Sequence, residues 1–197
     1  MKQIFLIGDS IRIGFSEDDT IKYGYGYHIQ NKLAGKAIVF NHSENGRFTQ
    51  YTLRYLDEWK KEIGAGDDVD IVHWNNGLWD VLRQYGDDCL TPIEQYKELL
   101  VRVFNRIRLL FPNAKVYFSL STPVIEAMAS KDFSRRNEDI RNYNDAARDI
   151  LTPLGVEIID LYSKAKLLQP QYSHDWVHYN EEGASILADF IIEQMKL

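Results

Sequence analysis

The stretch QIFLIGDS, residues 3–10, decides the fold that we expect for this chain. Its apolar run, residues 4–7, is typical of a short β-strand that is buried on both faces. The run ends at Gly8 and Asp9, and Ser10 then carries a hydroxyl to the carboxyl end of the predicted strand. Because functional sites of open α/β sheets form at this edge, Ser10 is a candidate nucleophile. The alternative is a plain turn in which Asp9 or Ser10 caps the next helix.

Short apolar runs and amphipathic segments alternate along the rest of the chain. Together with the first run, the predicted strands are residues 4–7, 37–40, 69–74, 114–120 and 156–159. The predicted helices are residues 28–33, 52–63, 92–111 with Thr91 as N-cap, 138–151, and 181–195 with Asn180 as N-cap. This alternation is typical of an α/β protein in which helices cover both faces of a parallel sheet. Since no linker or repeat divides the chain, we expect residues 1–197 to form one domain.

The composition is that of an ordinary globular protein and argues against several classes of partner. The net charge is −6 and the 23 Lys and Arg residues are dispersed, which disfavours nucleic acid and anionic membrane surfaces. No apolar run is long enough to span a bilayer, and the N-terminus shows no secretion signal. Cys89 is the only cysteine, so no internal disulfide can form. We therefore expect a cytoplasmic protein that acts on a small molecule, while the oligomeric state stays open.

A second polar cluster lies near the C-terminus, just before the last predicted helix. Asp175 and His178 are three residues apart there, so one loop can bring both side chains to a single site. In such a site His178 would take the proton of Ser10, and Asp175 would hold the imidazole in the correct tautomer. Two alternatives remain: His178 has only a structural place at the helix start, or His174, Asp175 and His178 bind a metal ion.

Acyl transfer to a serine also needs hydrogen-bond donors for the oxyanion that develops. The polar loop after the second predicted strand offers the N–H of Gly46, where a glycine lets the backbone approach a ligand closely. The loop after the third predicted strand offers the side-chain amides of Asn75 and Asn76. Either asparagine could instead shape its own turn beside Gly77.

With these groups of residues the chain resembles the SGNH (GDSL-type) hydrolases, serine esterases named after a Ser, a Gly, an Asn and a His in four separated blocks. Residues 8–10, Gly-Asp-Ser, resemble the first block, and residues 41–49, with Gly46 at the oxyanion glycine position, resemble the second. Asp175-x-x-His178 resembles the last block and lies in the expected place before the C-terminal helix. The resemblance spans nearly the whole chain.

The third block departs from the family's usual Gly-x-Asn-Asp. Residues 75–80 read Asn-Asn-Gly-Leu-Trp-Asp, which is similar to an Asn-x-Gly-Leu variant of carbohydrate-esterase-like members. We assign the oxyanion side chain to Asn75 because it comes first after the strand, and Asn76 is the alternative.

The resemblance implies a three-layer α/β/α flavodoxin-like fold with a five-stranded parallel sheet, and ester hydrolysis without a metal or other cofactor. In that case Ser10, Asp175 and His178 form the catalytic triad. The N–H groups of Ser10 and Gly46 and the Asn75 amide then hold the oxyanion.

The substrate is expected to be a small acyl ester, most simply an acetyl ester of a carbohydrate. Several side chains near the site loops could contact a sugar, or serve only packing and solvation: Trp74, Trp79, Trp176, Tyr179, Arg12 and Arg47. Residues 128–136 are polar and charged, and we expect a loop that gives a fatty chain no cover. The alternatives are a lysophospholipase or acyl thioesterase with the same triad, and a flavodoxin-like binding module without catalysis.

Overall fold

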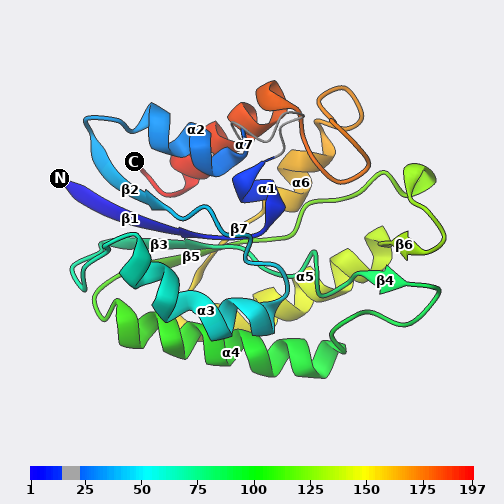
Figure 1. Cartoon of the computed structure of the whole chain (residues 1–197), viewed down its shortest axis with the longest axis horizontal. Helices are drawn as coiled ribbons and strands as arrows, with labels where there is room; N and C mark the ends of the chain where they lie inside the picture. The colour runs from blue at the N-terminus through cyan, green and yellow to red at the C-terminus, as the bar shows by residue number, and fades with distance from the viewer. Residues whose placement is uncertain (15–22) are drawn as a thin grey trace.

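The computed structural model describes residues 1–14 and 23–197, with a five-stranded parallel sheet at its centre (Figure 1). The strands are β1 (Lys2–Ile7), β2 (Ala37–Asn41), β3 (Ile71–Trp74), β5 (Lys115–Ser119) and β7 (Glu157–Ile159). They lie in the order β2-β1-β3-β5-β7, and all neighbours run parallel. The expected α/β fold is confirmed, and the predicted strand ends differ from the observed ones by one or two residues.

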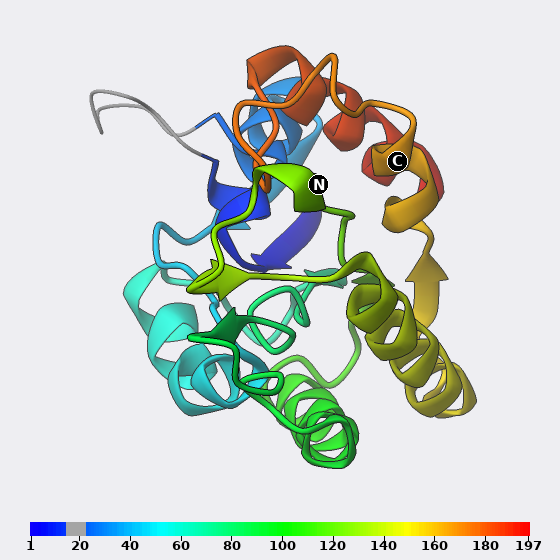
Figure 2. The same cartoon turned by 90° about the vertical axis from the view of Figure 1, so that its right-hand side faces the viewer.

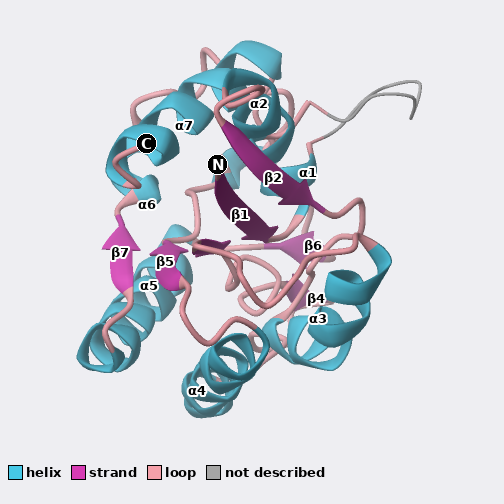
Figure 3. Ribbon diagram, turned by 90° about the vertical axis from the view of Figure 1, so that its left-hand side faces the viewer, coloured by secondary structure: helices cyan, strands magenta, loops and turns pink. Residues whose placement is uncertain are grey.

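Helices cover both faces of the sheet, which gives three layers (Figure 2 and Figure 3). One layer consists of α1 (Ser10–Ile13), α2 (Tyr25–Lys32), α6 (Leu161–Lys166) and α7 (Glu181–Gln194). The other consists of α3 (Thr49–Glu62), α4 (Ile93–Leu110) and α5 (Asn137–Leu151). Two short 3₁₀ helices are η1 (Glu126–Met128) and η2 (Thr152–Leu154). No helix in the described ranges is long and apolar enough to cross a membrane.

β1 marks the point at which the strand order reverses, because β2 and β3 pair with its two edges. Residues 4–7 are at most 1% exposed, as expected for a strand covered on both faces. On the α4 side, the ring of Phe5 packs on Phe111 with the ring centroids 4.9 Å apart. In open α/β sheets, ligands bind beyond the carboxyl ends of the strands at such a reversal. The fold therefore places the residues that follow β1 and β3 at the position where a site is expected.

Among the described α-helices, side chains cap the starts of α1, α6 and α7. Asn180 caps α7 as expected, because its side chain accepts the N–H of Gly183 at 2.9 Å. The expected Thr91 cap of α4 is wrong by one residue: Pro92 occupies the N-cap position, and no side chain caps this helix. The N–H of Thr91 instead donates to the Asp80 carbonyl at 3.0 Å, which ties this residue to the loop after β3.

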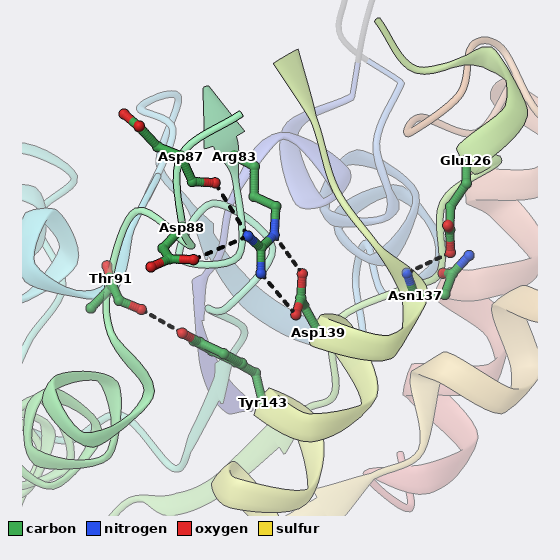
Figure 4. A network of polar contacts seen from close by, with 8 residues as sticks. All are labelled: Arg83, Asp87, Asp88, Thr91, Glu126, Asn137, Asp139 and Tyr143. Atoms are coloured by element: carbon green, nitrogen blue, oxygen red, sulfur yellow. Dashed lines mark hydrogen bonds and ion pairs between the residues drawn. The ribbon is translucent and has the colours of Figure 1, made fainter. Parts of the chain in front are cut away.

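Residues 128–136 are mostly loop, as expected, but two of them form a short strand. β6 (Phe133–Ser134) pairs antiparallel with β4 (Arg83–Gln84), and together they form a second, two-stranded sheet. An ion pair fixes this ribbon on the start of α5, where Nε of Arg83 donates to the Asp139 carboxylate at 2.8 Å (Figure 4). The segment therefore has a defined place in the fold, built by contacts that are distant in sequence.

Candidate active site

Ser10 follows β1 and is the first residue of α1. Asp9 is the N-cap of that helix, and its Oδ1 accepts the N–H of Ile11 at 2.9 Å. The capping role that was the structural alternative for this turn is thus filled by Asp9. The Ser10 hydroxyl points to another partner, since its Oγ lies 2.8 Å from Nε2 of His178.

His178 in turn contacts Asp175, with Nδ1 2.7 Å from Oδ2 of the carboxylate. Because a carboxylate can only accept, the proton lies on Nδ1, and Nε2 accepts the hydroxyl of Ser10. The three side chains therefore form one continuous chain of hydrogen bonds. Ser10 and His178 lie 168 residues apart in the sequence, so the fold alone brings them together.

The loop that carries the histidine is built around the carboxylate of Asp175. Its Oδ1 accepts the N–H of Val177 at 2.6 Å and that of His178 at 2.7 Å, and Ser173 pairs with Tyr179 across the base of the loop. Burial raises the pKa of Asp175, but the hydrogen bonds from His178 and from the two N–H groups outweigh it and hold this pKa well below its usual range. Asp175 is therefore ionised at neutral pH and far into the acid range.

Gly46 lies close to the start of the nucleophile turn, but its N–H already has a partner. It donates to the Gly8 carbonyl at 3.0 Å. A Cβ at this position would lie 2.8 Å from the same oxygen, so the approach of the two loops requires glycine. In contrast, no acceptor for the N–H of Ser10 is found among the described residues.

Asn76, the alternative oxyanion side chain, is fully buried and uses its whole amide. Its Oδ1 accepts from Nε1 of Trp74 at 2.6 Å. Its Nδ2 donates to the Arg47 carbonyl and to Oγ1 of Thr52, both at 3.0 Å. Both amide hydrogens are thus committed inside the protein, and Asn76 has none left for a substrate.

Asn75 keeps one amide hydrogen. Its Nδ2 donates to the Ser119 carbonyl at 2.9 Å, and no second acceptor is found in the described part of the chain. The turn that follows depends on Gly77, whose φ of 133° is a conformation that other residues rarely adopt. This requirement explains the glycine of the Asn-x-Gly-Leu sequence.

A pocket of about 390 Å³ lies over the nucleophile. Its lining includes polar groups and three aromatic rings: Ser10, His178, Arg135, Trp79, Phe133 and Trp176. Neither Gly46 nor Asn75 contributes to this lining. The pocket is thus polar at the nucleophile and largely aromatic around it.

Two of the four aromatic residues considered for sugar contacts line the pocket, namely Trp79 and Trp176. Trp74 is fully buried in β3, with its ring edge-to-face on Phe118 at 4.8 Å. Tyr179 is only 7% exposed. Core packing is therefore the correct interpretation of Trp74 and Tyr179.

The two arginines expected near a polar substrate do not line this pocket. Arg12 is 2% exposed, and its guanidinium donates to the Gly8 carbonyl and to three oxygens of residues 41–44. It holds the loop after β2 in place. Arg47 is exposed, with its guanidinium 4.9 Å from the ring centre of Tyr51. For Arg12 the structural alternative is therefore the correct one, because its guanidinium is bonded within the protein.

The sequence analysis missed Arg135, a charged residue that is only 4% exposed and lines the pocket. Its Nε donates to the Leu78 carbonyl at 2.5 Å. Burial lowers its pKa to about 10, against the attraction of Asp9 and Asp175, so it stays charged at neutral pH. The run Phe-Ser-Arg-Arg at residues 133–136 was the available signal, but a sequence does not show which arginine turns inward.

The metal alternative has no cluster of ligands to support it. Within residues 1–14 and 23–197, no three His, Cys, Asp or Glu side chains gather in a way that could hold a metal ion. Asp175 and His178 contact each other directly instead.

A serine after the first strand, joined to a histidine and an aspartate at the carboxyl edge of an α/β/α sheet, is the arrangement of a serine hydrolase. The sequence model of the GDSL-like Lipase/Acylhydrolase family matches residues 6–186. The chain therefore belongs to the GDSL-like lipase/acylhydrolase family.

Comparison with individual proteins agrees with this assignment. The chain is 24% identical over 206 residues to the GDSL esterase/lipase CPRD49 of Arabidopsis thaliana, a match that covers 98% of this chain and 78% of that protein. The lipase/acylhydrolase from Enterococcus faecalis has the same fold, with a TM-score of 0.76, 20% identity, and coverage of 100% of this chain and 96% of that one. The acetyl xylan esterase AlAXEase gives a TM-score of 0.70 and 17% identity, over 97% of this chain and 98% of that one.

Proposed function

We propose that this protein is a serine esterase that removes an acetyl group from a carbohydrate. The observation that carries the proposal is the pair of hydrogen bonds that joins Ser10 to His178 at 2.8 Å and His178 to Asp175 at 2.7 Å. A hydroxyl held against an imidazole, which is itself oriented by a carboxylate, is an activated nucleophile.

In the first half of the reaction, Oγ of Ser10 attacks the ester carbonyl carbon while Nε2 of His178 takes the hydroxyl proton. The tetrahedral intermediate collapses when His178 gives this proton to the departing alkoxide, which leaves Ser10 acetylated. In the second half, His178 deprotonates a water molecule that attacks the acetyl carbonyl, and acetate is released. Asp175 keeps the proton on Nδ1 and stabilises the imidazolium.

Three donors are proposed for the oxyanion. The N–H of Ser10 and the remaining amide hydrogen of Asn75 are available without any change in their hydrogen bonds. The N–H of Gly46 joins them when it turns from the Gly8 carbonyl toward the substrate oxygen. Donors that tighten on the substrate only when it is bound are common in enzymes of this kind.

Two observations support an acetylated sugar as the substrate. Trp79 and Trp176 border the nucleophile, and tryptophan faces can stack on sugar rings. An acetyl xylan esterase also shares the fold. The apolar walls that Phe133 and Val177 add to the pocket favour the second candidate, a lysophospholipase or acyl thioesterase with the same triad. A flavodoxin-like binding module gives no role to the bond between Ser10 and His178.

The test is hydrolysis of 4-nitrophenyl acetate by the purified protein and by its Ser10→Ala variant. We expect turnover by the wild type and none by the variant, with unchanged circular dichroism. Turnover by a folded Ser10→Ala protein would remove the nucleophile assignment. A panel of acetylated oligosaccharides beside a lysophospholipid then separates the two substrate classes, and a higher kcat/KM for the lipid would contradict the carbohydrate assignment.

A further inference from the structure

Arg135 is a buried cation with most of its hydrogen-bond donors unused. The side chain lines the pocket and only 4% of the residue is exposed. A guanidinium carries five N–H donors, and only Nε has a partner, the Leu78 carbonyl. Among the described residues, no acceptor contacts Nη1 or Nη2.

Three aromatic rings surround the guanidinium of Arg135. Its guanidinium carbon lies 5.6, 5.6 and 5.4 Å from the ring centres of Trp79, Phe133 and Trp176. Aromatic rings at this distance add cation–π attraction and lower the local dielectric, which strengthens an ionic contact of the guanidinium. Neither Nη1 nor Nη2 is a fully buried atom without a partner, so among the described residues both remain within reach of a ligand in the pocket.

The segment that carries Arg135 is also anchored on both sides. Before it, β6 pairs with β4, and Arg83 of β4 is bonded to Asp139 (Figure 4). After it, the N–H of Asn137 donates to the Glu126 carboxylate at 2.7 Å (Figure 4). The guanidinium is therefore held in position before a ligand arrives, which reduces the entropy lost on binding.

We propose that Arg135 binds a carboxylate on the alcohol part of the substrate, so that the natural ester is an acetylated acidic sugar or a similar hydroxy acid. The inference rests on the proposed esterase function, because it places this anion beside the ester that Ser10 attacks. The planar fork of arginine matches a carboxylate with two parallel hydrogen bonds. A singly charged group also suits the site better than a phosphate, because Asp9 and Asp175 lie near enough to interact with the guanidinium.

Two matched esters test this proposal, namely 3-acetoxybenzoate, which is anionic, and 3-acetoxybenzamide, which is neutral. For each protein the quantity measured is the kcat/KM of the anionic ester divided by that of the neutral ester. The two esters differ in intrinsic reactivity, but this difference is the same for the wild type and the variants and cancels when their ratios are compared. Arg135→Gln should lower the ratio by about 10- to 100-fold, the effect of losing a charged hydrogen-bonded contact. The control Arg54→Gln removes the same charge from an exposed site on α3 and should leave the ratio unchanged. An equal ratio in the wild type and Arg135→Gln would overturn the proposal.

Binding measured by calorimetry keeps this test independent of activity. Benzoate should bind the wild type more tightly than benzamide or phenyl phosphate, and Arg135→Lys, which keeps the charge without the fork, should weaken benzoate binding. Equal binding of benzoate and benzamide contradicts an anion site, and tighter binding of phenyl phosphate contradicts a carboxylate site. If neither ester is hydrolysed, the esterase proposal fails, while benzoate binding still decides the role of Arg135.

Discussion

Replacement of each asparagine after β3 by alanine should separate catalysis from stability. Asn75→Ala removes the amide hydrogen that we propose for the oxyanion, and the loss of one such donor lowers kcat by about 10²–10³-fold. The Ser119 carbonyl also loses the hydrogen bond that it now accepts at 2.9 Å. Ser119 is fully buried, and one buried group left unpaired lowers the free energy of unfolding by about 1–3 kcal/mol. We therefore expect a folded protein with little activity.

Asn76→Ala should show the opposite profile. The substitution leaves Nε1 of the fully buried Trp74 without an acceptor and the Arg47 carbonyl without its donor. Thr52 is less affected, because its hydroxyl still donates to the Gly46 carbonyl at 2.8 Å. A buried group left unpaired costs about 1–3 kcal/mol, and the Arg47 carbonyl is only partly buried. The free energy of unfolding should fall by about 2–4 kcal/mol.

Urea unfolding and kcat with 4-nitrophenyl acetate measure the two effects on the same preparations. Activity is expressed per folded molecule, so that a stability loss is not counted as a catalytic one. Asn113→Ala changes an exposed asparagine before β5 and should alter neither quantity. If Asn76→Ala is as stable as the wild type but loses kcat, while Asn75→Ala stays active, the oxyanion assignment is wrong by one residue.

Three further predictions concern pH, helix capping and the acyl chain. In a plot of log(kcat/KM) against pH, the acid limb should have a slope of one. Protonation of His178 removes the base, while Asp175, with its low pKa, stays ionised. A slope of two would contradict this prediction. Asp80→Ala should lower the free energy of unfolding by about 1–2 kcal/mol in urea titrations, because the Asp80 carboxyl accepts the N–H and Oγ1 of Thr49 at the start of α3. Burial raises the pKa of Asp80 to about 6, so the folded state binds this proton more tightly than the unfolded state does. The loss of unfolding free energy caused by Asp80→Ala should therefore be largest below pH 4 and shrink as the pH rises through about 6. A loss that grows with pH would refute this prediction. Aryl acetate should be cleaved faster than butyrate, and octanoate hardly at all, because we expect the bulky rings of Trp79 and Trp176 at the pocket to leave little room for a longer acyl chain. A kcat/KM maximum at C8 would contradict this.

The parts of the site that depend on local structure could be predicted from the sequence. The apolar run of residues 4–7 shows no alternation because the strand is covered on both faces, and a polar turn at its end must lie at the sheet edge. The spacing between Asp175 and His178 is also a local feature, since the carboxylate accepts N–H groups two and three residues further on. Such motifs keep their geometry in any fold that contains them.

Contacts between distant segments could not be predicted in this way. Thr91 has the sequence features of an N-cap, yet its N–H is bonded to Asp80, and the helix starts one residue later than expected. The N–H of Gly46 is taken by the Gly8 carbonyl, which follows from the packing of two loops and from no property of either loop alone. In both cases a tertiary hydrogen bond places the residue where the local pattern alone does not predict it.

The hydrogen-bond partners of the two buried arginines separate a structural cation, Arg12, from Arg135, the cation that we propose binds a ligand. From the sequence, Arg12 is a candidate for a substrate contact because it lies close to Ser10, and Arg135 is not a candidate. In the fold its guanidinium meets four oxygens, so no ligand is needed to stabilise it. Arg135 is buried almost as deeply but meets one oxygen. Because Nη1 and Nη2 of Arg135 have no acceptor among the described residues and the side chain lines the pocket, we expect a ligand to gain more from Arg135 than from an arginine already bonded within the protein.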